Sequence, residues 1–399
     1  MQPPRAIHWF VPEGLCVLAA LALAHLPALH SATSVTARIA PAVVAAAGLL
    51  LAWRFHRSRT VFAFVLLAVA WFVIRPATPT HAAAAQAVML LLPLDLAAVA
   101  LLPERGVFTE AGLLAWGMLG LQALVIGFLA STQGPATTAA LRTEWFSSET
   151  LAAWRIGQPA LMAFGLAAAL LLLFWILEPQ GSARVFWWAL LPTLLGSAST
   201  RAMHTAIYFA TAGLVLVTGI VEASYRMAYR DALTGLPSRR ALNEALERLN
   251  APAAIAMIDV DHFKPFNDRH GHDVGDQVLR LVAARLHANA AGATVYRFGG
   301  EEFAAVFPGT TVTTAVGQLE VMRQAVEGAV FLLRHRPRSP RKPASPPMRR
   351  RTRESRLAVT VSVGVALSDG VPERLAAALR AADQALYRAK EGGRNRVST

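Results

Sequence analysis

The pattern of hydrophobic positions changes near residue 225. Between residues 11 and 225, apolar runs long enough to cross a bilayer follow one another, separated by short connections that carry Arg, His, Pro or Gly. After residue 225 the apolar runs shorten and take on the periods of amphipathic helices and strands. We therefore predict a multi-span membrane domain over residues 1–225 and a separately folded domain over residues 226–399.

The N-terminal runs predict a polytopic α-helical membrane domain with about eight spans. The predicted spans cover approximately residues 11–30, 37–54, 60–76, 83–102, 109–131, 156–178, 184–199 and 204–225. A cleaved signal peptide is the competing interpretation of the first run. Because further apolar runs follow it, cleavage there would still leave a membrane protein.

Arginine positions predict the orientation of these spans, since cytoplasmic loops collect Lys and Arg. With the N-terminus inside, the inside segments hold Arg5, Arg54, Arg57, Arg59, Arg105, Arg184, Arg226 and Arg230. The outside loops then hold Arg38, Arg75, Arg142 and Arg201, with Arg155 at the edge of a span. This asymmetry predicts an even number of spans and a cytoplasmic C-terminal domain.

The C-terminal pattern predicts an α/β domain with a mixed sheet covered by helices. We expect helices at residues 239–249, 264–270, 274–287, 312–333 and 371–390, and strands at residues 253–259, 294–298, 302–307 and 358–366.

Charge is concentrated in one segment of this domain. The chain has a formal net charge of +13, but residues 334–356 alone hold ten Lys or Arg against a single acid, together with five prolines. We interpret this segment as a disordered basic insertion, with a lipid-headgroup contact as the alternative, and we expect no nucleic-acid partner. The single cysteine, Cys16, excludes an intramolecular disulfide and a cysteine-based metal cage.

Acidic residues mark the ends of two predicted strands. Asp259 and Asp261 follow the apolar strand, and Glu301 and Glu302 follow a Gly-Gly pair between two strands. Because glycine permits positive φ and close backbone approach, the sequence strand, Gly-Gly, strand predicts a tight hairpin. Carboxylates held there suit Mg²⁺, which takes oxygen ligands and shares them with substrate phosphates.

The segment RFGGEEF at residues 297–303 resembles the signature of the GGDEF family of diguanylate cyclases. Four further segments resemble the family in the same order: DALTGLPSRR at 231–240, DVDHFKPFNDRHGHDVGD at 259–276, VTVSVGVA at 359–366 and ADQALYRAKEGGRN at 382–395. Together they span nearly all of residues 226–399 apart from the insertion.

The resemblance implies a role for each matching residue. Glu301 would be the catalytic carboxylate, and Mg²⁺, with Mn²⁺ as the alternative, would be held by Asp259, Glu301, Glu302 and the backbone of Val260. The implied substrate-binding residues are Asn267, Asp276 and His272 for the guanine end, Lys264, Lys390 and Arg394 for phosphate, and Phe263 as a wall of the site. An alternative role for Lys390 and Arg394 is a favourable interaction of their positive charges with the C-terminal end of a helix dipole.

The resemblance further implies the activity and its setting. Two GTP would be condensed into cyclic di-GMP with release of pyrophosphate, across a homodimer on the cytoplasmic side of a bacterial-type inner membrane, under the control of the membrane domain. Ser238 replaces the usual Asn of the family, and Ala290 and Ala293 replace the Arg and Asp of its product-inhibition motif, so feedback inhibition through that motif is not expected. A catalytically silent receptor for GTP or cyclic di-GMP and a regulated transporter remain the alternative functions.

Overall fold

The computed structural model describes residues 11–25, 34–74, 82–132, 134–145, 154–178, 181–333, 355–371 and 375–399. The chain divides into two compact units, residues 1–224 and residues 225–399.

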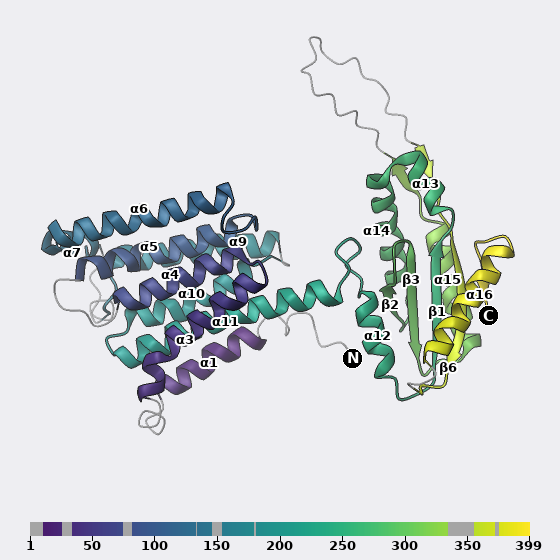
Figure 1. The fold of residues 1–399 in the computed structure, drawn as a ribbon, viewed down its shortest axis with the longest axis horizontal. Helices are drawn as coiled ribbons and strands as arrows, with labels where there is room; N and C mark the ends of the chain where they lie inside the picture. Colours follow the sequence, from purple (N-terminus) through teal and green to yellow (C-terminus); the bar gives the residue numbers. More distant parts are fainter. Residues whose placement is uncertain are drawn as a thin grey trace, which may run out of the picture. The chain divides into compact units, whose positions relative to one another are not determined.

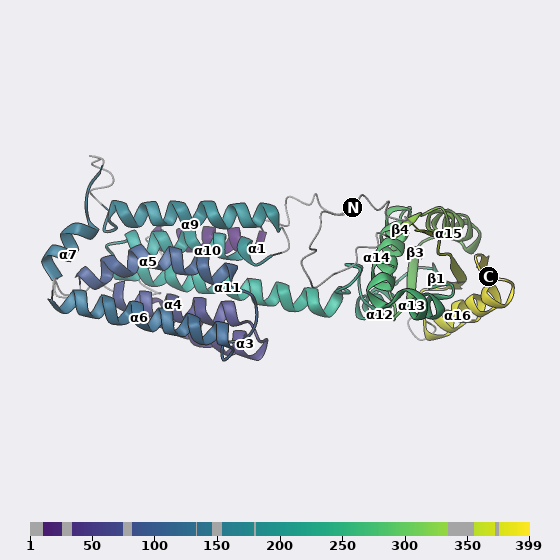
Figure 2. The same cartoon turned by 90° about the horizontal axis from the view of Figure 1, so that it is seen from above.

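The N-terminal unit is helical. Its helices are α1 (Val11–His25), α3 (Ser34–Arg54), α4 (Ser58–Ile74), α5 (Ala82–Leu101), α6 (Glu110–Thr132), α7 (Gly134–Leu141), α9 (Gln158–Leu177), α10 (Ala183–Ala198) and α11 (Ala202–Tyr229). Figures 1 and 2 show the longer helices running side by side as a bundle. The last helix, α11, continues past the predicted end of the last span at residue 225 without a break.

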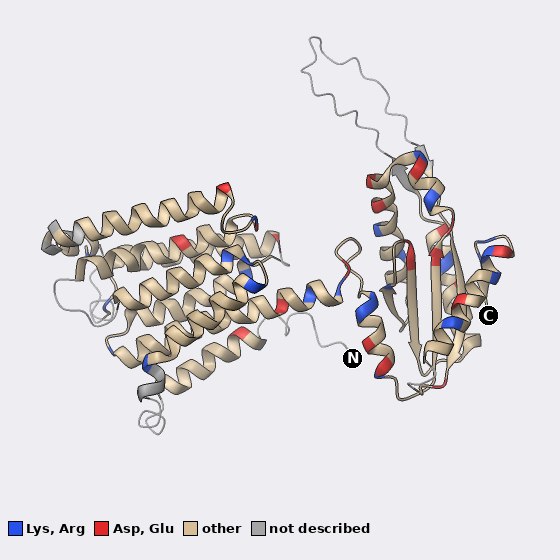
Figure 3. Cartoon of the chain, viewed as in Figure 1, with Lys and Arg blue, Asp and Glu red and all other residues tan. Residues whose placement is uncertain are grey.

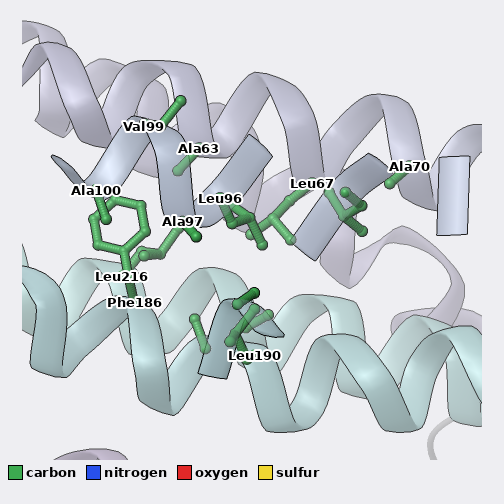
Figure 4. Close-up of a cluster of buried hydrophobic side chains, with 14 of the residues drawn as sticks. Ala63, Leu67, Ala70, Leu96, Ala97, Val99, Ala100, Phe186, Leu190 and Leu216 are labelled. Carbon is green, nitrogen blue, oxygen red and sulfur yellow. The ribbon is translucent and has the colours of Figure 1, made fainter. Parts of the chain in front are cut away.

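Small and large apolar side chains alternate in the core of this bundle. Leu67 from α4, Leu96 from α5, Leu190 from α10 and Leu216 from α11 meet there, with alanines between them (Figure 4). Small side chains at these contacts let the helix backbones approach closely, which favours dispersion contacts between the helices.

Four helices of the described chain are long and apolar enough to cross a membrane: α5, the Glu110–Phe128 part of α6, α9 and α11. The predicted number of about eight spans is therefore not supported. Two further apolar helices fall short of the required length, since Pro12–His25 and Ser58–Ile74 have fewer than the ~20 residues that a bilayer core needs. Charged residues are sparse along these helices and frequent on the C-terminal unit (Figure 3).

The C-terminal unit contains a five-stranded mixed sheet in the order β2-β3-β1-β6-β7. Its elements are α12 (Arg239–Glu247), β1 (Ala253–Val260), α13 (Phe263–His270), α14 (His272–Ala288), β2 (Thr294–Arg297), β3 (Glu302–Pro308), α15 (Val312–Glu327), β4 (Phe331–Leu333), β5 (Ser355–Leu357), β6 (Val361–Ser368), α16 (Leu375–Glu391) and β7 (Val397–Ser398). The central strand β1 is antiparallel to β3 and β6, and β7 is parallel to β6.

Helices cover both faces of this sheet, as predicted (Figure 1). Every residue of β1 is buried, and its side chains alternate between two cores. Ile258 and its neighbours on one face pack with α14 and α15. Met257 and its neighbours on the other face pack with α12 and α16. The apolar strand is therefore the centre of a layered α/β domain.

Three predicted elements differ from the structure. The helix predicted over residues 312–333 ends at Glu327, and residues 331–333 instead form β4, which pairs with β5. The strand predicted at 358–366 lies at 361–368, and the last helix begins at Leu375. Within the basic segment predicted at 334–356, residues 334–354 lie outside the described residues, and 355–356 begin β5.

Candidate active site

Asp259 lies one residue before the end of the central strand. Its side chain is 8% exposed, and one carboxylate oxygen lies 2.9 Å from the ammonium nitrogen of Lys390 on α16. By register Asp259 is paired with Glu302 at the start of β3, so the two side chains share the face covered by α16. The sheet thus brings together residues that are distant in the sequence.

The connection between β2 and β3 is the predicted tight hairpin. The amides of Phe298 and Gly299 donate to the carbonyl of Glu302, at 2.9 and 3.2 Å, and the amide of Val260 donates to the carbonyl of Glu301 at 3.3 Å. This last bond joins the turn to the end of β1, where Asp259 lies. Glu301 is therefore held beside the carboxylate predicted to be its partner.

The two glycines of this turn do not adopt the positive φ that glycine permits. Neither Gly299 nor Gly300 is among the residues with φ in the left-handed region. A Cβ on Gly299 would lie 2.8 Å from the carboxylate of Glu302, whereas a Cβ on Gly300 would meet nothing within 4 Å. A side chain at residue 299 would therefore require the flexible carboxylate of Glu302 to move away from the turn.

Arg297 clamps the turn from the side, which the sequence analysis did not foresee. Its guanidinium donates to the carbonyls of Gly299 at 3.2 Å and Gly300 at 2.7 Å, and to the carboxylate of Asp231 at 2.7 Å. Asp231 also accepts hydrogen bonds from the amide and hydroxyl of Thr234. Asp231 and Thr234 are thereby tied to the acidic turn.

The electrostatics of the site disfavour two neighbouring negative charges. Burial raises the pKa of Asp259 above its ordinary value, and the nearby ammonium of Lys390 offsets only part of that rise. Burial, then the charge of Asp259, raises the pKa of Glu301. Each carboxylate is therefore less stable in its charged form than an isolated one would be, and a bound cation would relieve this repulsion.

These groups fit a hard divalent cation that completes its coordination elsewhere. Asp259, Glu301 and Glu302 are oxygen donors gathered at one edge of the sheet, next to the main chain of Val260. Among the described residues no three or more His, Cys, Asp or Glu side chains lie close enough together to hold a metal ion by themselves. An open set of carboxylates suits Mg²⁺, which keeps several water or phosphate ligands.

A second group of predicted residues lies on the helix pair α13 and α14. Phe263 is buried and stacks on Phe266, with ring centroids 6.4 Å apart. The side-chain oxygen of Asn267 is buried without a hydrogen-bond partner. A Cβ on Gly275 would lie 1.8 Å from that oxygen, so this glycine makes the space that Asn267 occupies. The sequence analysis missed the role of Gly275.

The remaining predicted substrate residues are exposed. Lys264 lies on α13, His272 and Asp276 lie on the first turns of α14, and Arg394 follows α16. Arg394 has a φ of 63°, in the left-handed region, and its charge lowers the pKa of Asp259. The structure thus gathers Arg394 and Lys390 with the acidic residues, and gathers Asn267, His272 and Asp276 on the helix pair.

Asp261 has a structural role at the end of β1. It is buried and accepts hydrogen bonds from the hydroxyls of Thr360 (2.7 Å) and Ser362 (2.6 Å) and from the amide of Asn395 (3.1 Å). These bonds join the end of β1 to β6 and to the loop that carries Arg394. Asp261 therefore holds the loop that carries Arg394 in place.

Known proteins resemble the C-terminal unit in sequence. Residues 228–396 match the family model described as "Diguanylate cyclase, GGDEF domain". The response regulator PleD of Caulobacter vibrioides is 36% identical over 185 residues, which cover 44% of this chain and 37% of that protein. The diguanylate cyclase DgcP of Pseudomonas aeruginosa is 36% identical over 44% of this chain and 25% of its own length. The chain thus spans well under half of these curated relatives.

A longer match extends into the N-terminal unit. The probable diguanylate cyclase DgcC of Escherichia coli is 32% identical over 258 residues, covering 60% of this chain and 62% of that protein. Among solved structures, the coiled coil and GGDEF domain of DgcB from Caulobacter crescentus in complex with c-di-GMP matches with a TM-score of 0.37 and 32% identity, over 46% of this chain and 91% of that one. The C-terminal unit of this chain, over residues 228–396, is therefore a GGDEF domain.

Proposed function

We propose that this chain is a diguanylate cyclase, which converts two GTP into one cyclic di-GMP and two pyrophosphates. The observation that carries the proposal is the convergence of Asp259, Glu301 and Lys390 where the central strand meets the acidic hairpin. Relatives that are 32–36% identical and bear the name diguanylate cyclase support the same activity. A catalytically silent receptor is the competing function.

The acidic edge of the sheet would hold the metal and the reacting groups. Asp259, Glu301, Glu302 and the main chain of Val260 would bind Mg²⁺, or Mn²⁺ in its place, through oxygen atoms. When bound, the metal supplies charge neutralisation at the phosphates and lowers the pKa of the attacking hydroxyl. Glu301 would be the catalytic carboxylate, accepting the proton of the 3′-hydroxyl as that oxygen attacks the α-phosphorus of the second GTP and pyrophosphate leaves.

The cationic residues would orient the triphosphate. Lys390 already lies against Asp259, so it can turn from that carboxylate to a phosphate oxygen when a metal takes its place. Arg394 lies near enough to Asp259 to affect its pKa. Lys264 would add a third positive charge from α13. Together they offset the negative charge that two triphosphates bring to the site.

The helix pair would select guanine. Asn267 presents a buried oxygen without a partner, and Asp276 adds an exposed carboxylate on α14. Both can accept hydrogen bonds, and the guanine edge offers N–H donors at N1 and N2. Adenine would leave an acceptor unpaired, at a cost of about 1–3 kcal/mol. His272 and Phe263 would border the same pocket.

Two copies of the domain would be needed for a full turnover. Each would present one GTP, and the two nucleotides would meet across a two-fold axis, because each 3′-hydroxyl must reach the α-phosphorus of the other. The apolar helices of the N-terminal unit would anchor the homodimer in the inner membrane, with the cyclase domain in the cytoplasm. A change in that unit would act through α11, which is continuous as far as Tyr229.

The decisive experiment measures GTP turnover by the purified full-length protein in lipid nanodiscs with Mg²⁺, together with Glu301→Gln and the matched control Asp383→Asn on the exposed side of α16. We expect cyclic di-GMP and pyrophosphate in a 1:2 ratio from the unaltered protein and from Asp383→Asn, and a loss of at least about a thousandfold for Glu301→Gln. A folded dimer that binds GTP and releases neither product would instead establish the receptor function.

A further inference from the structure

A cavity of about 500 Å³ lies among α4, α5 and α6 in the N-terminal unit. Most of its wall is aliphatic, with Val69 from α4, Leu92 from α5 and Leu119 and Ile126 from α6, and Trp116 adds an aromatic ring. This volume falls in the range of ~300–1,000 Å³ that is usual for small-molecule sites. The cavity is partly open at the surface of the unit, so a ligand could reach its walls.

Small residues on α6 open the cavity. Gly120, Ala123 and Gly127 line it, and a Cβ on either glycine would meet nothing within 4 Å. The Glu110–Phe128 part of α6 is predominantly apolar, yet only 11% of it is buried inside the unit. Larger side chains at residues 120 and 127 could therefore occupy this space without a clash. The sequence nevertheless has glycine at both positions.

Two polar side chains form one end of this apolar cavity. The amide of Gln122 donates a hydrogen bond of 3.1 Å to one carboxylate oxygen of Asp95. Two acceptor atoms remain there, the second oxygen of Asp95 and the carbonyl oxygen of Gln122. The ion pairs found in the described part of this unit join Arg59 to Glu104 and Arg184 to Glu13 and Glu222, and none involves Asp95.

A carboxylate placed on an apolar helix is costly unless a cation accompanies it. The cavity is partly open, and it presents a negative group at one end and apolar side chains along its walls. Charge complementarity therefore favours a cationic head that can donate to two acceptors, attached to an apolar body. A neutral acyl chain would fill the hydrocarbon part and leave Asp95 and Gln122 unmatched, and a fatty acid would be repelled by Asp95.

We propose that this cavity is a binding site for an amphipathic amine, with its ammonium group on Asp95 and Gln122 and its apolar body against Trp116 and Leu119. The ammonium would donate one hydrogen bond to each remaining acceptor and neutralise Asp95. The site lies wholly within the N-terminal unit, so the proposal stands or falls independently of cyclase activity.

The test measures binding of radiolabelled decylamine to the full-length protein in nanodiscs of zwitterionic lipid, with empty nanodiscs as the blank. We expect saturable binding that unlabelled decylamine displaces and that decanol and decanoate displace at least about tenfold less well, since only the amine makes the charge-assisted contact. Asp95→Asn should weaken binding at least about tenfold. Gly120→Leu should abolish it by filling the cavity.

Gly117→Leu is the matched control, because Gly117 lies on the same helix, has open space around it and does not line the cavity. It should bind decylamine as the unaltered protein does. Circular dichroism and size-exclusion chromatography identify any variant that fails to fold. If Asp95→Asn does not fold, the comparison of Gly120→Leu with Gly117→Leu tests the binding site instead. Binding no greater than to empty nanodiscs, equal displacement by decanol, or equal loss in Gly117→Leu and Gly120→Leu would each overturn the proposal.

Discussion

Gly275→Ala gives a sharp test of how the helix pair α13 and α14 selects its ligand. The added methyl group would lie 1.8 Å from the side-chain oxygen of Asn267, which must then move by about 1.5 Å to reach an ordinary van der Waals distance. That oxygen is the far end of a rotatable side chain, so the fold can accommodate the methyl group. Alanine also favours a helix over glycine by about 1 kcal/mol. We therefore expect the melting temperature to stay the same or to rise.

Activity should respond in the opposite direction. Displacing Asn267 removes its hydrogen bonding to the guanine edge, at a cost of about 1–3 kcal/mol, which corresponds to a drop of about 5- to 150-fold in kcat/KM for GTP. Steady-state kinetics of the full-length protein measures this drop, and Gly317→Ala on α15 is the control, because a Cβ there meets nothing within 4 Å.

A double-mutant cycle with Asn267→Ala separates this mechanism from a general disturbance of α14. Once Asn267 is truncated, the methyl group at residue 275 meets only the ring edge of Phe263, at 3.2 Å, so the second substitution should cost little further. Additive losses in the double variant, or an unchanged kcat/KM in Gly275→Ala, would refute the role assigned to Asn267.

Three further predictions follow from the acidic edge and its supports. The folded-state pKa values of Asp259 and Glu301 are raised in the metal-free protein, so protonation of these carboxyls begins at a higher pH than usual and competes with metal binding. At subsaturating Mg²⁺ the activity should therefore fall as the pH drops through that raised range, and a profile that stays flat down to pH ~4 would contradict this. A raised pKa in the folded state also means that the ionised carboxylate destabilises the fold at neutral pH. Without metal, the inactive variant Glu301→Gln should therefore melt at a higher temperature than the unaltered protein. This difference should vanish at low pH, where Glu301 is protonated. Arg297→Lys keeps the positive charge but loses the planar guanidinium that donates to two carbonyls of the turn. We therefore expect kcat to fall by about tenfold or more and the free energy of unfolding to fall by about 1–3 kcal/mol. Wild-type values in both the kinetic and the thermal assay would contradict this role of Arg297.

Several features of the fold could be predicted from local pattern. The strands β1, β2 and β3 lie within one residue of their expected ends, since a continuous or alternating apolar run bounded by Gly and Pro leaves little choice. The helices α12, α13 and α14 were also found within about two residues. The span count was wrong because hydropathy marks apolar segments without fixing the length of the helix that each one forms.

Other features depend on contacts between distant residues. Residues 331–333 continue an apolar pattern and were therefore assigned to the preceding helix, but they pair with residues 355–357 across the basic segment. Arg297 and Asp231 are 66 positions apart, and no local pattern indicates that one guanidinium joins them to the glycine turn. Such pairings become visible once the sheet has set the register.

The sequence alone determined the chemistry that is available: the carboxylates at the ends of two strands, the paired glycines, the cations near the C-terminus and the apolar runs of the first 225 residues. The tertiary structure decided which of these groups meet. It placed Lys390 against Asp259, made Asp261 a buried support, let Gly275 create the space of Asn267 and opened a cavity beside Asp95. The physical reason is that residue type and local period govern backbone conformation, whereas proximity, burial and charge interactions arise only when distant segments pack together.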